Sequence, residues 1–141
     1  NRVSRNQIMA IKEESVTDQK NSLTVCLDNI LRHAGITRNT EYDLAQGKTA
    51  IQILEENMTG VQVLDLSGCS LDAVLYYVNQ DIPVLAILED GEAVLVTGFN
   101  EFNVVIMEPS TGKLYKKGMN DATTWFAENG NHFISYMKID N

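Results

Sequence analysis

Hydrophobic residues are densest between positions 82 and 112, where three apolar runs are separated by two short polar breaks. The runs cover residues 82–88, 93–99 and 104–107, and the breaks contain Asp90-Gly91 and Asn100-Glu101. Asp-Gly between apolar runs predicts a hairpin, because glycine adopts the positive φ that a tight primed turn requires. We therefore expect a three-stranded antiparallel meander. The runs are apolar at nearly every position, which predicts that both faces of the sheet are covered.

A helix is predicted over residues 22–33. Its apolar residues recur with helical spacing and form one face, at Leu23, Cys26, Leu27, Ile30, Leu31 and Ala34. Ser22 occupies the position expected for an N-cap, and Gly35 the position where a helix ends. We expect the apolar face to pack against the sheet.

The remaining pattern adds short helices and strands around this centre. Further helices are predicted over residues 50–58 after a Thr49 cap, from Ser70 or Asp72 to about Asn79, and over 122–128. Further strands are predicted over 7–11, 61–66, 113–116 and 132–139. Helices come mainly before the strands, which is typical of an α+β fold. The chain of 141 residues suits one domain, which we place at residues 19–141 after an N-terminal arm at residues 1–18.

Composition narrows the classes of partner. The formal net charge is -8 and no basic patch is visible, so we expect no nucleic-acid partner. There is no apolar run of about 18 residues, so we expect no membrane insertion by this domain, and the first residues lack the apolar core of a signal peptide.

Cysteine and histidine are sparse. Cys26 and Cys69 have no metal-ligand spacing, and we interpret them as buried thiols, with a disulfide between them as the alternative. His33 and His132 are isolated, which disfavours a zinc site. We expect both to be surface residues and expect no metal and no cofactor.

Three segments have the order and spacing of a known peptidase family. They are NSLTVCLDNILRHAG at 21–35, LDAVLYYVNQDIPVLAIL at 71–88 and GEAVLVTGFNEFNVVIMEPSTGKL at 91–114. They resemble the nucleophile helix, the helix and strand entry, and the histidine-bearing hairpin of the double-glycine, bacteriocin-processing leader peptidases. That family is a papain-like group of bacterial cysteine peptidases. The resemblance covers residues 19–136 and implies a papain-like α+β fold, with the N-terminal helix packed on a central antiparallel sheet.

The residues that carry the family's chemistry are replaced here. The position of the nucleophilic cysteine falls on Ser22, that of the histidine on Glu92, and that of the orienting aspartate or asparagine on Glu108. Leu23 replaces the glycine beside the nucleophile, and Gln19 lies near the oxyanion-hole glutamine but is offset from it. All three triad positions therefore differ from the family, and we expect none of them to be catalytic.

Each of these residues also has a structural interpretation. Ser22 could be a nucleophile or an N-cap, and Cys26 could be the nucleophile if the alignment slips by one helical turn. Counting from the turn near residue 100 places Glu92 and Glu108 as cross-strand neighbours, either as a cation site or acid/base pair or as two solvated carboxylates. His132 as a relocated base is the weaker alternative to an exposed histidine.

The sequence thus favours a catalytically degenerate, leader-peptidase-like domain. We expect it to bind a peptide or partner segment in the former substrate groove, between the Ser22 helix and the Glu92–Glu108 hairpin, and the acidic pair to favour a basic or N-terminal amine group. One alternative is an active hydrolase using Ser22 or Cys26, and another is a structural or sensory accessory domain of a larger bacterial surface protein. The resemblance favours a bacterial extracytoplasmic or membrane-tethered location.

Overall fold

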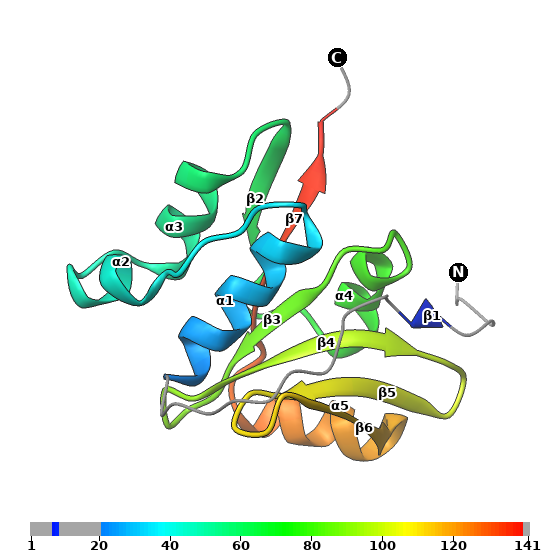
Figure 1. Cartoon of the computed structure of the whole chain (residues 1–141). Coiled ribbons are helices and arrows are strands. Elements are labelled where there is room, and N and C mark those ends of the chain that lie inside the picture. The colour runs from blue at the N-terminus through cyan, green and yellow to red at the C-terminus, as the bar shows by residue number, and fades with distance from the viewer. Residues whose placement is uncertain (1–6, 9–20, 140–141) are drawn as a thin grey trace.

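The computed structural model describes residues 7–8 and 21–139 (Figure 1). Along the chain the elements are β1 Gln7–Ile8, α1 Ser22–His33, α2 Glu41–Ala45, α3 Ala50–Asn57, β2 Val61–Asp65, α4 Leu71–Val78, β3 Val84–Ile87, β4 Ala93–Phe99, β5 Asn103–Glu108, β6 Lys113–Gly118, α5 Met119–Glu128 and β7 His132–Lys138. The fold is a mixture of helices and an antiparallel sheet, as the sequence predicts. Of the predicted N-terminal arm and its strand, only Gln7–Ile8 falls within the described residues.

The described strands form one sheet in the order β2-β7-β3-β4-β5-β6, with β1 paired to β4. Every pairing is antiparallel. The predicted meander is confirmed, because β3 pairs with β4 and β4 with β5. The last strand, β7, enters the sheet between β2 and β3 and so joins the early part of the chain to the meander.

Helices cover both faces of the sheet. In Figure 1, α1 crosses in front of the sheet, whereas α4 and α5 lie behind it. The helix α1 contacts β3 and β4, α4 contacts β3, β4 and β7, and α5 contacts β5 and β6. Behind the sheet, the rings of Phe126 in α5 and Phe133 in β7 have centroids 5.3 Å apart. All residues of β4 are buried, which confirms that the centre of the meander is covered on both faces.

The hairpin between β3 and β4 differs from the predicted turn. The backbone N–H of Leu88 donates to the carbonyl of Glu92 at 2.8 Å, and the N–H of Gly91 donates to the carbonyl of Leu88 at 2.9 Å. These bonds enclose a three-residue loop, residues 89–91, in which Gly91 has a φ of +86°. Asp90 does not have a positive φ, so the two-residue primed turn is wrong, although the glycine takes the expected left-handed conformation.

The boundaries of α1 follow the sequence, but its cap does not. Asn21 is the N-cap, and its side-chain oxygen accepts a hydrogen bond from the N–H of Leu23 at 2.7 Å. Ser22 is therefore the first helical residue, and its prediction as the N-cap is wrong. Gly35, at a φ of +88°, ends the helix as predicted. In α3, Thr49 forms the predicted cap as part of a reciprocal capping box.

Among the described residues, no helix combines the length and the apolar character needed to cross a membrane.

Candidate functional site

Ser22 links the start of α1 to the start of β4. The side chain is half-buried, and its Oγ accepts a hydrogen bond from the backbone N–H of Ala93 at 2.8 Å. Ala93 is fully buried, so this bond satisfies a backbone donor that would otherwise be hidden from water. The structure therefore brings the predicted nucleophile position next to the strand that follows Glu92, and uses the Ser22 oxygen as an acceptor there.

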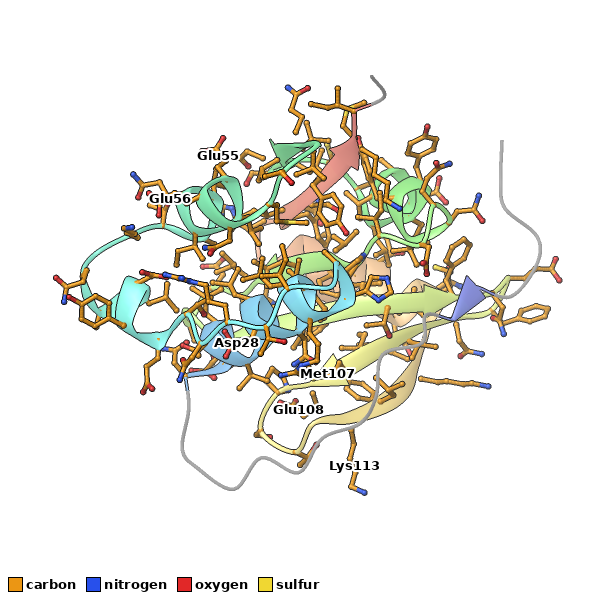
Figure 2. All side chains as sticks on the ribbon, turned by 45° about the horizontal axis from the view of Figure 1, so that its top comes forward. Asp28, Glu55, Glu56, Met107, Glu108 and Lys113 are labelled. Carbon is orange, nitrogen blue, oxygen red and sulfur yellow. The ribbon has the colours of Figure 1, made fainter. Side chains whose placement is uncertain are left out.

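The two glutamates have different surroundings. Glu92 is exposed and lies between the hairpin loop and β4, where its backbone N–H donates to the carboxylate of Asp90 at 2.9 Å. Glu108 is half-buried at the end of β5, and its Oε1 accepts from the backbone N–H and the hydroxyl of Ser110, both at 3.2 Å. Figure 2 shows Glu108 on the hairpin near Met107.

The prediction that Glu92 and Glu108 are cross-strand neighbours is wrong. The β4–β5 register pairs Leu95 with Met107, so the next position along β5, Glu108, lies opposite Val94 and not opposite Glu92. The register shifts between Val96 and Gly98, where β4 contains an irregularity. The error comes from the turn, because Phe99 pairs with Val104 and the strands therefore reverse between residues 101 and 102, not at Asn100. The extra residue in β4 shifts the register by only one position.

Cys26 lies in the core. It is fully buried, and burial raises the pKa of its thiol far above the ordinary value, with a smaller contribution from the Glu108 carboxylate. A thiol in this environment stays protonated and does not act as a nucleophile. Cys69 is half-buried, and both cysteines are free, so the alternative of a disulfide is not realised.

Neither histidine of the chain lies beside Ser22. His33 is eleven residues further along α1, about 16 Å away at the rise of an α-helix. Its Nε2 donates to the backbone carbonyl of Asp81 at 3.0 Å, and its side chain is only 12% exposed, so the prediction of a surface residue is wrong. His132 is exposed, as predicted, and its ring lies over Gly130, where an added Cβ would be 3.0 Å from Nε2.

The candidate site at the start of α1 therefore has the Ser22 hydroxyl but no histidine side chain hydrogen-bonded to it. A serine nucleophile needs a general base within hydrogen-bonding reach, and the group bonded to Ser22 Oγ is an N–H donor. Gln19, the oxyanion candidate, lies outside the described residues. Within the described ranges, no three His, Cys, Asp or Glu side chains are grouped as metal ligands.

Sequence reasoning missed the polar residues that support α1. Asp28 is 7% exposed, and its Oδ1 accepts hydrogen bonds from the backbone N–H and hydroxyl of Thr40 at 2.8 and 2.9 Å. Asp43 is similarly buried and pairs with Arg38, whose Nη2 lies 2.9 Å from Oδ2. The bonds between Thr40 and Asp28 fix the connection to α1, and the pair of Arg38 and Asp43 joins that connection to α2. The only signal in the sequence was an acidic residue next to the apolar face, at Asp28.

Comparison with known proteins supports the fold. A solved structure from Bacillus anthracis, provisionally described as a C39-like peptidase, superposes with a TM-score of 0.76 at 14% sequence identity, over 96% of this chain and 99% of that chain. No protein-family model and no curated protein matches the sequence. At this identity the likeness shows the fold alone, and the chain therefore has the fold of a C39-like peptidase.

Proposed function

We propose that this chain is a catalytically degenerate, papain-like peptidase domain that binds an extended peptide or partner segment. The observation that carries the proposal is the Ser22 hydroxyl, which accepts the Ala93 N–H at the position where the resemblance places a nucleophile. The fold is similar to that of a C39-like peptidase, while the chemical groups of the triad are replaced. A retained fold with replaced chemistry favours binding over hydrolysis.

The arrangement argues against rebuilt catalysis. Ser22 has no imidazole beside it, since His33 lies at the other end of α1 and His132 lies over Gly130. Glu92 is exposed, and the hydrogen bond that Ser22 Oγ makes is to the Ala93 N–H and not to the Glu92 carboxylate. The thiol of Cys26 is inaccessible and protonated at neutral pH.

The charge of the proposed groove suggests the chemistry of its ligand. We place the groove between the start of α1 and the β4–β5 hairpin, where Glu92 is exposed and Glu108 is half-buried. Carboxylates at a binding surface favour cationic partners and disfavour anionic ones. We therefore propose a ligand segment with lysine, arginine or a free N-terminal amine. On the basis of the resemblance, we also propose a bacterial extracytoplasmic or membrane-tethered location.

Hydrolysis is tested directly. The full chain is incubated with fluorogenic peptides, including one with a double-glycine cleavage site, and with a serine-directed fluorophosphonate, alongside Ser22→Ala and Cys26→Ala variants. We expect the parent chain to cleave the peptides no faster than the two variants do, and we expect the fluorophosphonate not to label Ser22. Turnover that is lost in either variant would contradict the proposal and establish the active-hydrolase alternative.

Binding is tested with charge-matched probes. Two fluorescent peptides of the same length are compared by anisotropy, one with lysines and one with glutamates at the same positions. We expect saturable binding of the basic peptide, weakened several-fold in Glu92→Gln and Glu108→Gln variants. Glu101→Gln, at the other end of the β4–β5 hairpin, is the matched control. Equal binding of both peptides, or an equal effect of Glu101→Gln, would contradict the proposed groove.

A further inference from the structure

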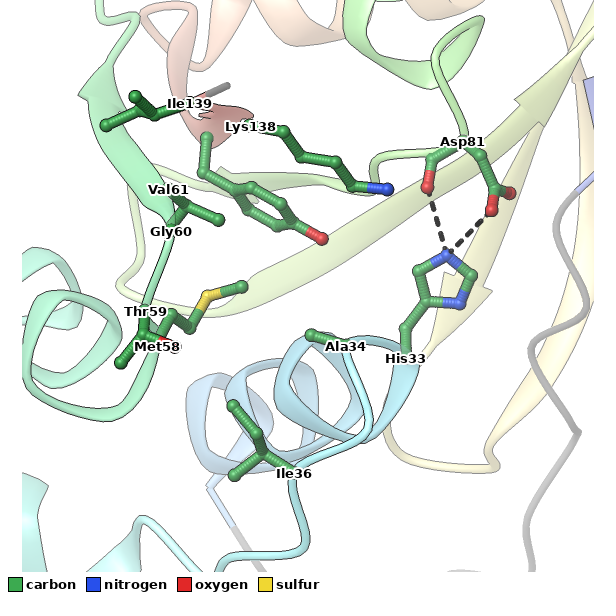
Figure 3. A pocket seen from close by; sticks show the side chains of 11 residues that line it. His33, Ala34, Ile36, Met58, Thr59, Gly60, Val61, Asp81, Lys138 and Ile139 are labelled. Carbon is green, nitrogen blue, oxygen red and sulfur yellow. Dashed lines mark hydrogen bonds and ion pairs between the residues drawn. The ribbon is translucent and has the colours of Figure 1, made fainter. Parts of the chain in front are cut away.

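A cavity lies at the end of α1 opposite Ser22. Its volume is about 560 Å³, within the range of small-molecule sites. Figure 3 shows that its walls come from the end of α1, the connection from α3 to β2, the segment before β3 and the end of β7. Four segments that are distant in the sequence thus form one concave surface, separate from the proposed peptide groove.

One part of the cavity is apolar. Met58, Ile36 and Val61 line it. Met58 is 7% exposed, and Ile36 and Val61 are partly buried against the core. Methionine adapts to side chains of different shape. This surface suits a large aliphatic or aromatic side chain.

A tyrosine hydroxyl also lines the cavity. Tyr136 is only 3% exposed, and its hydroxyl has no hydrogen-bond partner among the described residues. Burial, and secondarily the Asp81 carboxylate, raise the pKa of Tyr136, so the phenol stays protonated and can donate. The ring is buried while the hydroxyl is not among the fully buried polar atoms, so the hydroxyl is accessible from the cavity and available to a ligand.

Opposite charges line the same cavity. Lys138 is exposed, and Figure 3 shows its ammonium group reaching toward Asp81. In the described part of the chain no ion pair joins these two residues. Asp81 is held by His33, whose Nε2 lies 3.0 Å from its carbonyl oxygen and 3.5 Å from its Oδ2. Asp81 also has a φ of +66°, a conformation that is uncommon outside glycine and that fixes its position beside the cavity.

We propose that this cavity binds a free α-amino acid with a large apolar side chain, such as leucine, methionine or phenylalanine. An α-amino acid carries its ammonium and carboxylate on one carbon, so its site needs a cationic and an anionic group close together. Lys138 and the Tyr136 hydroxyl bind the carboxylate, and Asp81 binds the ammonium. The side chain of the ligand packs on Met58 and its apolar neighbours. This inference does not depend on the proposed peptide groove.

The charge requirement is tested by calorimetric titration of the full chain. L-leucine, L-methionine and L-phenylalanine are the probes, and N-acetyl-L-leucine and L-leucinamide each lack one charge. We expect saturable binding of the amino acids and at least about tenfold weaker binding of both derivatives, because each loses a charge-assisted hydrogen bond. No binding of any amino acid at millimolar concentration, or equal binding of either derivative, would overturn the proposal.

Three variants locate the site. Lys138→Met, Asp81→Asn and Tyr136→Phe should each weaken L-leucine binding, the first two by about tenfold. Asparagine tolerates the positive φ of Asp81. Thermal unfolding confirms that each variant is folded. Lys116→Met, on the exposed edge strand β6, is the control and should leave binding unchanged.

The outcomes separate this site from the peptide groove. Unchanged amino-acid binding in Lys138→Met and Asp81→Asn, or an equal loss in Lys116→Met, would refute the assignment to this cavity. Binding of the basic peptide should be unaffected by Lys138→Met, so either proposal can fail while the other holds.

Discussion

Replacing Ser22 by alanine removes the acceptor that joins the first turn of α1 to β4. The bond from the Ala93 N–H to Ser22 Oγ is 2.8 Å long and connects segments 71 residues apart. Ala93 is fully buried, so the variant leaves a donor without a partner at the edge of the core. We expect Ser22→Ala to destabilise the fold because that donor loses its bond and stays poorly hydrated.

The magnitude follows from the surroundings. Leaving a buried backbone donor unsatisfied costs about 1–3 kcal/mol, and because Ser22 is half-buried, water can recover part of this. We therefore expect a loss of about 1–2 kcal/mol in the free energy of unfolding. With a urea m-value of roughly 2 kcal/mol/M for a domain of this size, the midpoint should fall by roughly 0.5–1 M. Urea titration followed by circular dichroism measures the shift.

The matched control is Ser110→Ala. Ser110 also makes a side-chain hydrogen bond, to Glu108 at 3.2 Å, but it is exposed. We expect Ser110→Ala to lower the free energy of unfolding by no more than about 0.5 kcal/mol. If Ser22→Ala and Ser110→Ala unfold at the same urea concentration as the parent chain, the structural role of the Ser22 hydroxyl is refuted.

Three further predictions concern single groups. Cys26 should resist iodoacetamide at neutral pH until the protein unfolds, whereas the half-buried Cys69 should react faster. Mass mapping of the labelled residues measures the difference, and rapid labelling of Cys26 in the native protein would contradict its burial. Thr49→Ala should lower stability by about 1 kcal/mol in thermal unfolding, because α3 loses its capping box, whereas Thr49→Ser should retain most of it. Hydrogen bonds from Ser67 lower the pKa of Asp65 in the folded protein. The ionised Asp65 should therefore stabilise the fold above its unfolded-state pKa, and this stabilisation should be lost as the pH falls through the folded-state pKa. An NMR titration that finds an ordinary or raised pKa for Asp65 would contradict this.

Local patterns predicted most elements. Helical spacing of apolar residues placed α1 at residues 22–33, and Gly35 ended it, because these signals depend on neighbours within one or two turns. The meander was also predicted, since each strand is an apolar run bounded by a turn. Asn21 and Ser22 are adjacent and both can cap a helix, so the local pattern did not decide between them, and the N-cap is Asn21 and not the predicted Ser22.

The candidate site was predicted only in part. The resemblance placed Ser22 near the start of β4, where the structure has it bonded to Ala93. The relation between Glu92 and Glu108 was predicted wrongly because the β4–β5 turn is centred between residues 101 and 102 and not at Asn100, whereas the irregularity between Val96 and Gly98 shifts the register by only one residue.

By itself the sequence determined the type and approximate limits of the helices and strands and the apolar centre of the sheet. Only the tertiary structure decided that β7 lies between β2 and β3, that Cys26 is inaccessible, and that Tyr136, Lys138 and Asp81 line one cavity. The physical reason is the range of the interactions. Helix and turn formation depends on residues a few positions apart, whereas strand order, burial and cavity walls depend on packing between distant segments.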